Sequence, residues 1–278
     1  MPSGAPQIAT ELPRISLGEV RWARDGAGRL GVHPGARSAC EEAGLRTVDD
    51  FLTAPGELIS RHQRTEVIRL TLPGGLEIYL KRHLRPHRKD AYWAFTRHCR
   101  PISAAWEEWK NMDRLAAVEV ATPVAVALGE RGRGLNREPS FLATQAVQGC
   151  EPLPALLTRL DAVARRRVAG LLARTLRRMH EARLDHPDLY ARHVLVHHSL
   201  ESCVLLDVQR TRRRRRLHWR WRHRDLAALD VTLDPGPVPD TLRLRFLAEY
   251  CPRPDRARWL AAAVRRRTPV LRQRGRGL

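Results

Sequence analysis

Two aspartates stand in apolar stretches of this chain, and a histidine follows the first at a short, defined distance. Asp188 lies in "HPDLYARHVLV", with His193 five positions later, and Asp207 ends the apolar run "CVLLD". Phosphoryl transfer needs an acid that orients the attacking hydroxyl and acceptors that hold a divalent metal between the phosphates. These residue types in this order indicate a phosphotransferase, although an acid after an apolar strand is often only a turn residue or an N-cap.

A lysine and a glutamate earlier in the chain supply the remaining groups of such a site. Lys81 ends the segment "LEIYLK", and Glu108 lies in "SAAWEEWKNMDRLAAVEV", where Glu107 is the alternative because only one of the two can face the lysine. Protein kinases order these groups as a strand lysine, a helix glutamate, H-R-D with an asparagine five residues after its aspartate, and D-F-G. The order and spacing hold here, with H-P-D, histidine and D-V-Q as substitutions.

Hydrophobic periodicity predicts the elements that would position these residues. Alternation over residues 67–72, the turn "PGG" and the segment "LEIYLK" indicate a β-hairpin, and helical spacing begins after Ser103, which suits an N-cap. Further strands are predicted in "TPVAVALGE" and "SFLATQAVQG". The helix that follows carries an apolar stripe opposite an arginine-rich face, formed by Val168, Leu171, Leu172, Leu176 and Met179.

The change from strands to helices predicts an α+β, protein-kinase-like fold with two lobes. We place an N-terminal extension at residues 1–50, a small strand-rich N-lobe at 51–146 and a helical C-lobe at 147–278, with the junction near Thr144–Gly149. A chain of 278 residues is long enough to build such a fold around a real core.

Composition narrows the cellular setting. No apolar run approaches the roughly 18 residues needed to span a bilayer, and the start "MPSGAPQIATELPRIS" lacks a secretory signal. We therefore expect a cytoplasmic protein. The five cysteines lie far apart without a CxxC pair, which predicts mostly buried apolar residues rather than a zinc or redox site: Cys40, Cys99, Cys150, Cys203 and Cys251.

The positive charge is large and concentrated. The formal net charge is +20, and the segment Arg210–Arg224 alone carries nine arginines. Such a field attracts anions, whether phosphorylated or carboxylated sugars, an anionic membrane leaflet or nucleic acid. A solvated charge run is the simpler interpretation, and nucleic-acid contact with Trp219 and Trp221 as stacking residues is the rival one. These two tryptophans share strand parity, so one apolar strand face is also possible.

Several segments together resemble the lipopolysaccharide core kinases of the Kdo/WaaP family. The specific part is "HPDLYARHVLV" followed by "LLDVQR" and "RWRHRDLAALD", because that family has H-R-D, then histidine in place of asparagine, then D-L-Q/H-R and a basic segment leading to a D-L-x-x-L helix. Supporting segments are "EIYLKRH", "EEWKNMDRL", "SFLATQAVQG" as the hinge between lobes, and "RLRFLAEY". The resemblance runs from about residue 45 to 270.

The resemblance implies an ATP- and Mg²⁺-dependent kinase acting on a heptose or Kdo hydroxyl of the lipopolysaccharide inner core. Asp188 would be the catalytic base, Asp207 would hold Mg²⁺, Lys81 would bind the α- and β-phosphates of ATP, and Glu108 would orient the lysine. His193 would take the second-metal position or hydrogen-bond Asp188, two roles that the sequence leaves open. His186 would brace the loop and Asp225 would anchor it as a structural acid. The arginine run would face an anionic glycolipid and the inner leaflet, placing the enzyme at the periphery of the inner membrane.

Departures from the kinase pattern leave alternatives open. Pro187 replaces the arginine before the catalytic aspartate, and Gln209 replaces the flexible glycine after the metal-binding one. No G-x-G-x-x-G precedes Lys81, and the basic turn Ser60–Thr65, with Arg61, Arg64 and His62, stands where a phosphate-covering loop belongs. A kinase with a protein or other small-molecule acceptor would use the same residues. A catalytically inactive module that binds anions or nucleic acid is the remaining hypothesis. The sequence does not give the oligomeric state.

Overall fold

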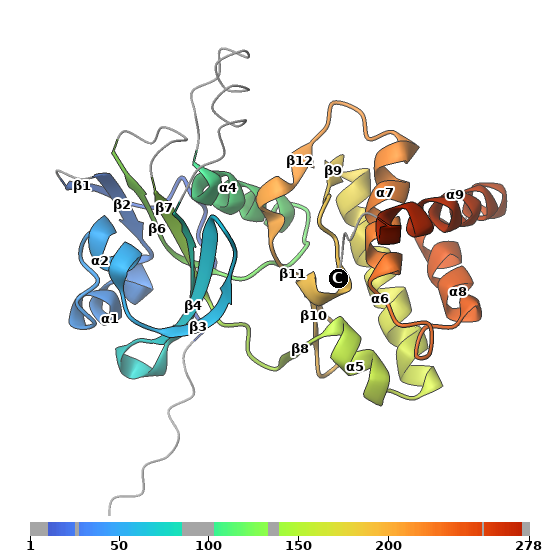
Figure 1. Cartoon of the computed structure of the whole chain (residues 1–278), viewed down its shortest axis with the longest axis horizontal. Helices are drawn as coiled ribbons and strands as arrows, with labels where there is room; N and C mark the ends of the chain where they lie inside the picture. The colour runs from blue at the N-terminus through green and yellow to red at the C-terminus, as the bar shows by residue number, and fades with distance from the viewer. Residues whose placement is uncertain (1–10, 26–27, 85–102, 133–138, 252, 274–278) are drawn as a thin grey trace, which may run out of the picture. The chain divides into compact units, whose positions relative to one another are not determined.

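The computed structural model describes residues 11–25, 28–84, 103–132, 139–251 and 253–273 (Figure 1). The chain divides into two compact units. The first contains Met1–Asp113 and Pro123–Ala146, and the second contains Arg114–Thr122 and Val147–Leu278. Across the described residues the first unit is rich in strands and the second in helices, so the predicted α+β class and the change of character along the chain are confirmed.

The first unit is built on an antiparallel sheet of seven strands in the order β1-β2-β6-β7-β5-β4-β3. The predicted hairpin is formed by β4 and β5, between β7 and the edge strand β3; a turn at Pro73–Gly75 with Gly74 and Gly75 at positive φ joins its two strands in unbroken register. The strands are β1 (Trp22–Asp25), β2 (Gly28–Val32), β3 (Glu57–Arg61), β4 (Thr65–Thr71), β5 (Glu77–His83), β6 (Ala125–Arg131) and β7 (Ser140–Gln145).

Two short helices, α1 (Arg37–Glu42) and α2 (Val48–Thr53), contribute to the core of this unit. Phe51 of α2 is fully buried and stacks on Phe141 of β7 with ring centroids 4.4 Å apart. Alternate residues of β5, Ile78 and Leu80, are fully buried in the same core. The period-two pattern of β5 therefore fixes which of its side chains point into the core and which, including Lys81, point away from it.

The described residues between 11 and 50 are part of the first unit rather than a separate extension. Strand β2 pairs with β6 over five residues, from Gly28↔Arg131 to Val32↔Ala127, and β1 pairs with β2. The first unit therefore begins well before residue 51. Its last residue, Ala146, is where the N-lobe was expected to end, although the internal segment Arg114–Thr122 groups with the second unit.

The second unit is a set of helices with two small sheets. The sheets have the strand orders β11-β10-β8 and β12-β9, and helix α6 carries the predicted apolar stripe, with Val168, Leu172, Leu176 and Met179 buried and Leu171 half-buried. Figure 1 shows α7, α8 and α9 beside α6. The elements are β8 (Cys150–Pro152), α5 (Leu153–Arg159), α6 (Ala162–Glu181), β9 (Leu184–Asp185), β10 (Val194–His197), β11 (Cys203–Leu205), β12 (Arg212–Arg213), α7 (Trp219–Val231), α8 (Asp240–Tyr250) and α9 (Pro254–Gln273).

The arginine run has more structure than its composition suggested. Arg212 and Arg213 form β12, and the segment from Trp219 onward is the first part of helix α7. The shared strand face predicted for Trp219 and Trp221 is therefore wrong, because both residues are helical. None of the helices in the described part of the chain has the length and apolar character needed to cross a bilayer.

Most cysteines follow the prediction. Cys40, Cys203 and Cys251 are buried and Cys150 is half-buried, while Cys99 lies outside the described residues. Burial raises the pKa of the Cys40 thiol to about 11, with Glu41 raising it further, so this thiol stays protonated at neutral pH.

Candidate active site

Lys81 and Glu108 form a half-buried ion pair in the first unit. Lys81 lies on the interior strand β5, and its Nζ is 3.0 Å from Oε2 and 3.2 Å from Oε1 of Glu108. Glu108 lies on helix α4 (Ala104–Ala116), which starts as predicted, since the Trp106 N–H donates to Ser103 Oγ at 3.1 Å. The structure thus pairs the lysine with Glu108, as the kinase pattern predicts, and not with the alternative Glu107.

Asp188 sits in a tight loop between β9 and β10 of the second unit. The loop is held by its own main chain, with the Leu189 N–H donating to the His186 carbonyl at 3.1 Å and the Tyr190 N–H to the Asp188 carbonyl at 2.8 Å. Leu189 is fully buried and anchors the loop, whereas the Asp188 side chain remains 14% exposed. The main chain of Asp188 is therefore fixed in place, while its carboxylate remains partly accessible.

His193 makes a hydrogen bond to Asp188, one of the two roles that the sequence left open. Its Nδ1 lies 2.8 Å from the main-chain carbonyl oxygen of Asp188. A carbonyl only accepts, so Nδ1 carries the proton, and in the neutral ring Nε2 presents its lone pair. A histidine oriented by such a bond can ligate a metal through its other nitrogen. The hydrogen bond goes to the main chain of Asp188 rather than to its carboxylate.

Asp207 follows β11 and lies beside the start of β10. The Leu206 N–H donates to the His193 carbonyl at 2.8 Å, and Leu205 pairs with Val194, so the ladder brings Asp207 and His193 to the same end of the two strands. Asp207 has a left-handed conformation, with φ 52° and ψ 50°. Such conformations are uncommon outside glycine and concentrate at functional sites.

These residues suit a metal that is held mainly by phosphates. The described residues contain no cluster of three or more histidine, cysteine or acidic side chains that could hold a metal ion. Mg²⁺ is usually bound through one or two carboxylates together with waters and substrate phosphates. One carboxylate, Asp207, with the Nε2 of His193 nearby in the ladder, fits that mode of binding.

Asp225 anchors the loop that carries Asp188 through a buried network. Its Oδ2 accepts from the His186 N–H at 2.8 Å and lies 3.3 Å from His180 Nε2, while Arg224 donates to Oδ1 at 2.6 and 2.8 Å. Burial works to raise the pKa of Asp225, but the bonds from His180 and His186 and the charge of Arg224 outweigh it and lower the pKa. This geometry agrees with the predicted structural role of Asp225.

His186 braces the loop as a neutral side chain. It is fully buried, and its Nε2 lies 3.1 Å from the Leu206 carbonyl, one residue before Asp207. Burial lowers the pKa of His186, although Asp225 and the bond to Leu206 raise it. The ring therefore links the loop that carries Asp188 to the strand end that carries Asp207.

The sequence reasoning did not single out Asp185, which organises the arginine run. Asp185 is fully buried on β9 and accepts from the Arg212 N–H at 2.9 Å. The guanidinium groups of Arg214 and Arg224 lie 2.7 and 3.2 Å from its Oδ2. The sequence did contain a signal for Asp185: an acid directly before the H-P-D triplet, with an excess of arginines further along the chain that need a partner.

The basic turn Ser60–Thr65 contains an arginine that is paired with an acid of the same sheet. Arg61 pairs with Glu66 at 2.7 Å across the turn between β3 and β4, and Glu66 also accepts from the buried Arg82. The pKa of Glu66 is lowered by its bonds to Arg82 and Arg61. Arg61 is therefore engaged with the sheet, and the structure gives no support to the idea that it covers phosphates.

The first unit thus unites Lys81 and Glu108, and the second unites Asp188, His193 and Asp207. A strand lysine paired with a helix glutamate, and a separate acid loop followed by a second acid, define the protein-kinase-like class. The chain belongs to the lipopolysaccharide kinase (Kdo/WaaP) family, whose model matches residues 57–250. The family resemblance and the kinase-like fold expected from the sequence are confirmed.

Known relatives agree with this assignment. The chain is 33% identical over 175 residues to the lipopolysaccharide core heptose(I) kinase WaaP of Pseudomonas aeruginosa, covering 56% of this chain and 62% of that relative. It is 26% identical over 192 residues to the heptose(I) kinase WaaP of Escherichia coli, covering 65% and 72%. A solved structure of WaaP in complex with acyl carrier protein superposes with a TM-score of 0.66 at 27% identity, covering 87% of this chain and 99% of that one.

Proposed function

We propose that this protein is an ATP-dependent kinase that phosphorylates a heptose or Kdo hydroxyl of the lipopolysaccharide inner core. The observation that carries the proposal is the occurrence of both half-sites with kinase geometry, the 3.0 Å Lys81–Glu108 pair and the Asp188–His193–Asp207 group. Support comes from relatives that are named as heptose(I) kinases. The presence of all four charged residues of a kinase site also argues against the inactive module considered above: Lys81, Glu108, Asp188 and Asp207.

Each residue has a defined task in this reaction. Glu108 holds the Lys81 amine in place for the α- and β-phosphates of ATP, and Asp188 accepts the proton of the attacking sugar hydroxyl. Asp207, with Nε2 of His193 as a second ligand, would hold Mg²⁺. A bound Mg²⁺ would neutralise charge on the transferred phosphate. Catalysis then consists of positioning and charge stabilisation rather than covalent chemistry.

The acceptor is tested by comparing substrates. We expect ADP release with MgATP to rise at least tenfold when heptose-containing core oligosaccharide is added, and mass spectrometry of the product to show one added phosphate. A basic protein substrate and free monosaccharides serve as controls for the alternative acceptors. Phosphorylation of the protein substrate without any of the oligosaccharide would contradict the proposal and favour the alternative.

We further propose that the enzyme works at the cytoplasmic face of the inner membrane. Trp221 has the guanidinium carbons of Arg214 and Arg224 at 4.2 and 4.8 Å from its ring centroid, and Trp259 is 47% exposed. Tryptophan and arginine side by side suit the interface of an anionic bilayer. Co-sedimentation with vesicles that contain anionic lipid, but not with neutral ones, is the expected result; equal partition with both would contradict it.

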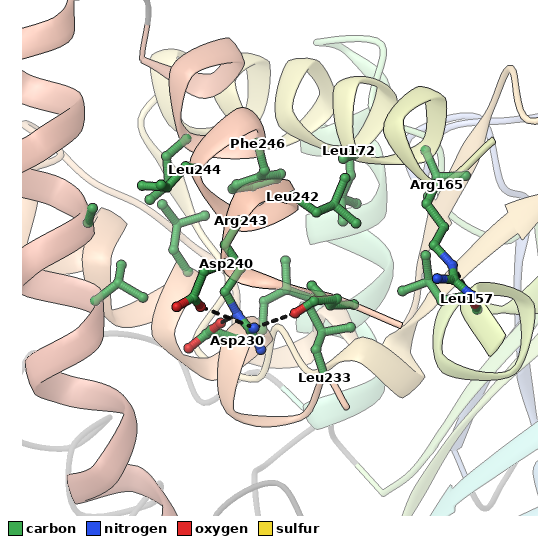
Figure 2. A pocket seen from close by; sticks show the side chains of 18 of the residues that line it. Leu157, Arg165, Leu172, Asp230, Leu233, Asp240, Leu242, Arg243, Leu244 and Phe246 are labelled. Carbon is green, nitrogen blue, oxygen red and sulfur yellow. Dashed lines mark hydrogen bonds and ion pairs between the residues drawn. The ribbon is translucent and has the colours of Figure 1, made fainter. Parts of the chain in front are cut away.

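We propose acyl carrier protein as a partner, since a structure of a WaaP relative contains it. The second unit has an apolar cavity of about 170 Å³ between α6, α7, α8 and α9. Figure 2 shows leucines from several helices turned into it, with Asp230 bonded to Arg243 at its edge. Such a cavity could take a short apolar chain.

Gel filtration with acylated and with unacylated carrier protein tests this proposal. If neither form made a complex, carrier protein would not be a partner. If both forms made the complex equally well, the cavity would have no role in binding the acyl chain.

A further inference from the structure

An arginine contacts the carboxylate of Asp188 from the turn that follows Asp207. Arg210 Nη1 lies 2.8 Å from Asp188 Oδ1, and the two side chains are 63% and 14% exposed. Arg210 ends the one-turn helix Val208–Arg210, which is pinned by the buried Val208. The same turn therefore presents the candidate metal-binding acid and an arginine directed at the candidate base.

Fold stability does not account for this contact. An ion pair with a largely exposed arginine contributes little to the free energy of unfolding, about 0–1 kcal/mol. The arginines of the run that stabilise the unit are Arg214 and Arg224, which are 23% and 17% exposed and pair with the fully buried Asp185. Arg210 differs from them because its partner is the most accessible acid of the catalytic loop.

Asp188 needs an external group to orient its carboxylate. The loop's main-chain bonds fix the Cα of Asp188 but leave rotation about χ2, which is broad for aspartate. Among the residues that the structure describes, Arg210 makes the side-chain contact to this carboxylate. Arg192 of the same loop faces elsewhere, with its guanidinium over Tyr190 at 5.4 Å.

We propose that Arg210 is a positioning residue that acts through Asp188. By donating to Oδ1 it turns Oδ2 toward the acceptor hydroxyl. In the reaction the hydroxyl proton passes to Oδ2, the sugar oxygen bonds to the γ-phosphorus, and the bond from that phosphorus to the bridging oxygen breaks to release ADP. Arg210 keeps its protons throughout. The inference rests on the proposed function, which assigns Asp188 its role as the base.

The change Arg210→Ala should lower kcat roughly 30-fold, because a misplaced catalytic group costs up to about a hundredfold in rate. The KM values for ATP and for core oligosaccharide should stay within about twofold, and the melting temperature should change by less than about 2 °C. ADP release with core oligosaccharide as the acceptor measures the rates. The matched control is Arg167→Ala, which removes a 53% exposed arginine and its 2.9 Å pair with Glu201 in the same unit and should leave kcat unchanged.

A double variant separates positioning from substrate binding. If Arg210 acts through Asp188, Arg210→Ala should cause no further loss in the Asp188→Asn background. A native kcat in Arg210→Ala beside an inactive Asp188→Asn would overturn this inference and leave the proposed function standing. A raised KM for the acceptor with native kcat would also overturn it. Full activity of Asp188→Asn would refute the base assignment and the inference together.

Discussion

The change Asp188→Asn is expected to lower kcat for phosphorylation of the acceptor by roughly a thousandfold. The amide has nearly the shape of the carboxylate but cannot accept the hydroxyl proton, and general-base catalysis contributes about 10²–10⁴ in rate. The fold should persist, because the bonds that hold the loop come from its main chain and from His193, not from the carboxylate. Single-turnover phosphorylation and circular dichroism on the same preparation measure both quantities.

A second aspartate provides the control for charge removal. Asp255 also pairs with an arginine, Arg253 at 3.7 Å, and is 67% exposed on α9. Asp255→Asn removes the same charge from the same unit and should retain native kcat. If Asp188→Asn kept more than about a tenth of the native kcat, the acid would be a loop residue without a chemical task.

Much of the fold and of the site could be predicted because the relevant signals are local. The alternation that defines β4 and β5, the apolar stripe of α6 and the N-cap at Ser103 are each contained within a few turns or one hairpin. The order of residue types predicted that Lys81 pairs with an acid of the next helix, and the spacing in the family favoured Glu108 over Glu107. That order is informative because phosphoryl transfer requires few groups and kinases place them in a set sequence.

The remaining features depend on contacts between distant residues. Strands β1 and β2 are short and rich in charge; β2 becomes a strand by pairing with β6 about a hundred positions later, and β1 then pairs with β2. From its composition, the simplest interpretation of the arginine run was a solvated segment. In the structure the buried Asp185 binds several of its arginines, and the run forms β12 and the start of α7. A fully buried acid cannot be distinguished from a turn residue without knowledge of its three-dimensional neighbours.

The change Asp225→Ala is expected to lower the free energy of unfolding by about 3–5 kcal/mol, because it removes a fully buried acid, leaves the half-buried Arg224 without this partner and leaves the His186 N–H without an acceptor. His180, whose Nδ1 lies 2.6 Å from the Tyr250 hydroxyl, would lose Asp225 as the hydrogen-bond partner of its Nε2. The loop that carries Asp188 should become more mobile, because its His186 N–H is held by Asp225. Urea denaturation of both proteins, compared at equal m-values, measures the difference.

The pH dependence of the difference in unfolding free energy between the native protein and Asp225→Ala shows whether Asp225 stabilises the fold by its charge or only by its packing. The folded pKa of Asp225 is lowered, so its ionised form stabilises the protein above the unfolded pKa of about 3.9 and loses this contribution as the pH falls toward the folded value. The gap between native and variant should therefore be constant from about pH 5 to 8 and narrow below about pH 4. Asp255→Ala, which removes a 67% exposed carboxylate and its pair with Arg253, should cost no more than about 1 kcal/mol. A gap for Asp225→Ala that stayed constant down to pH 3 would show that its carboxylate acts by shape and not by charge.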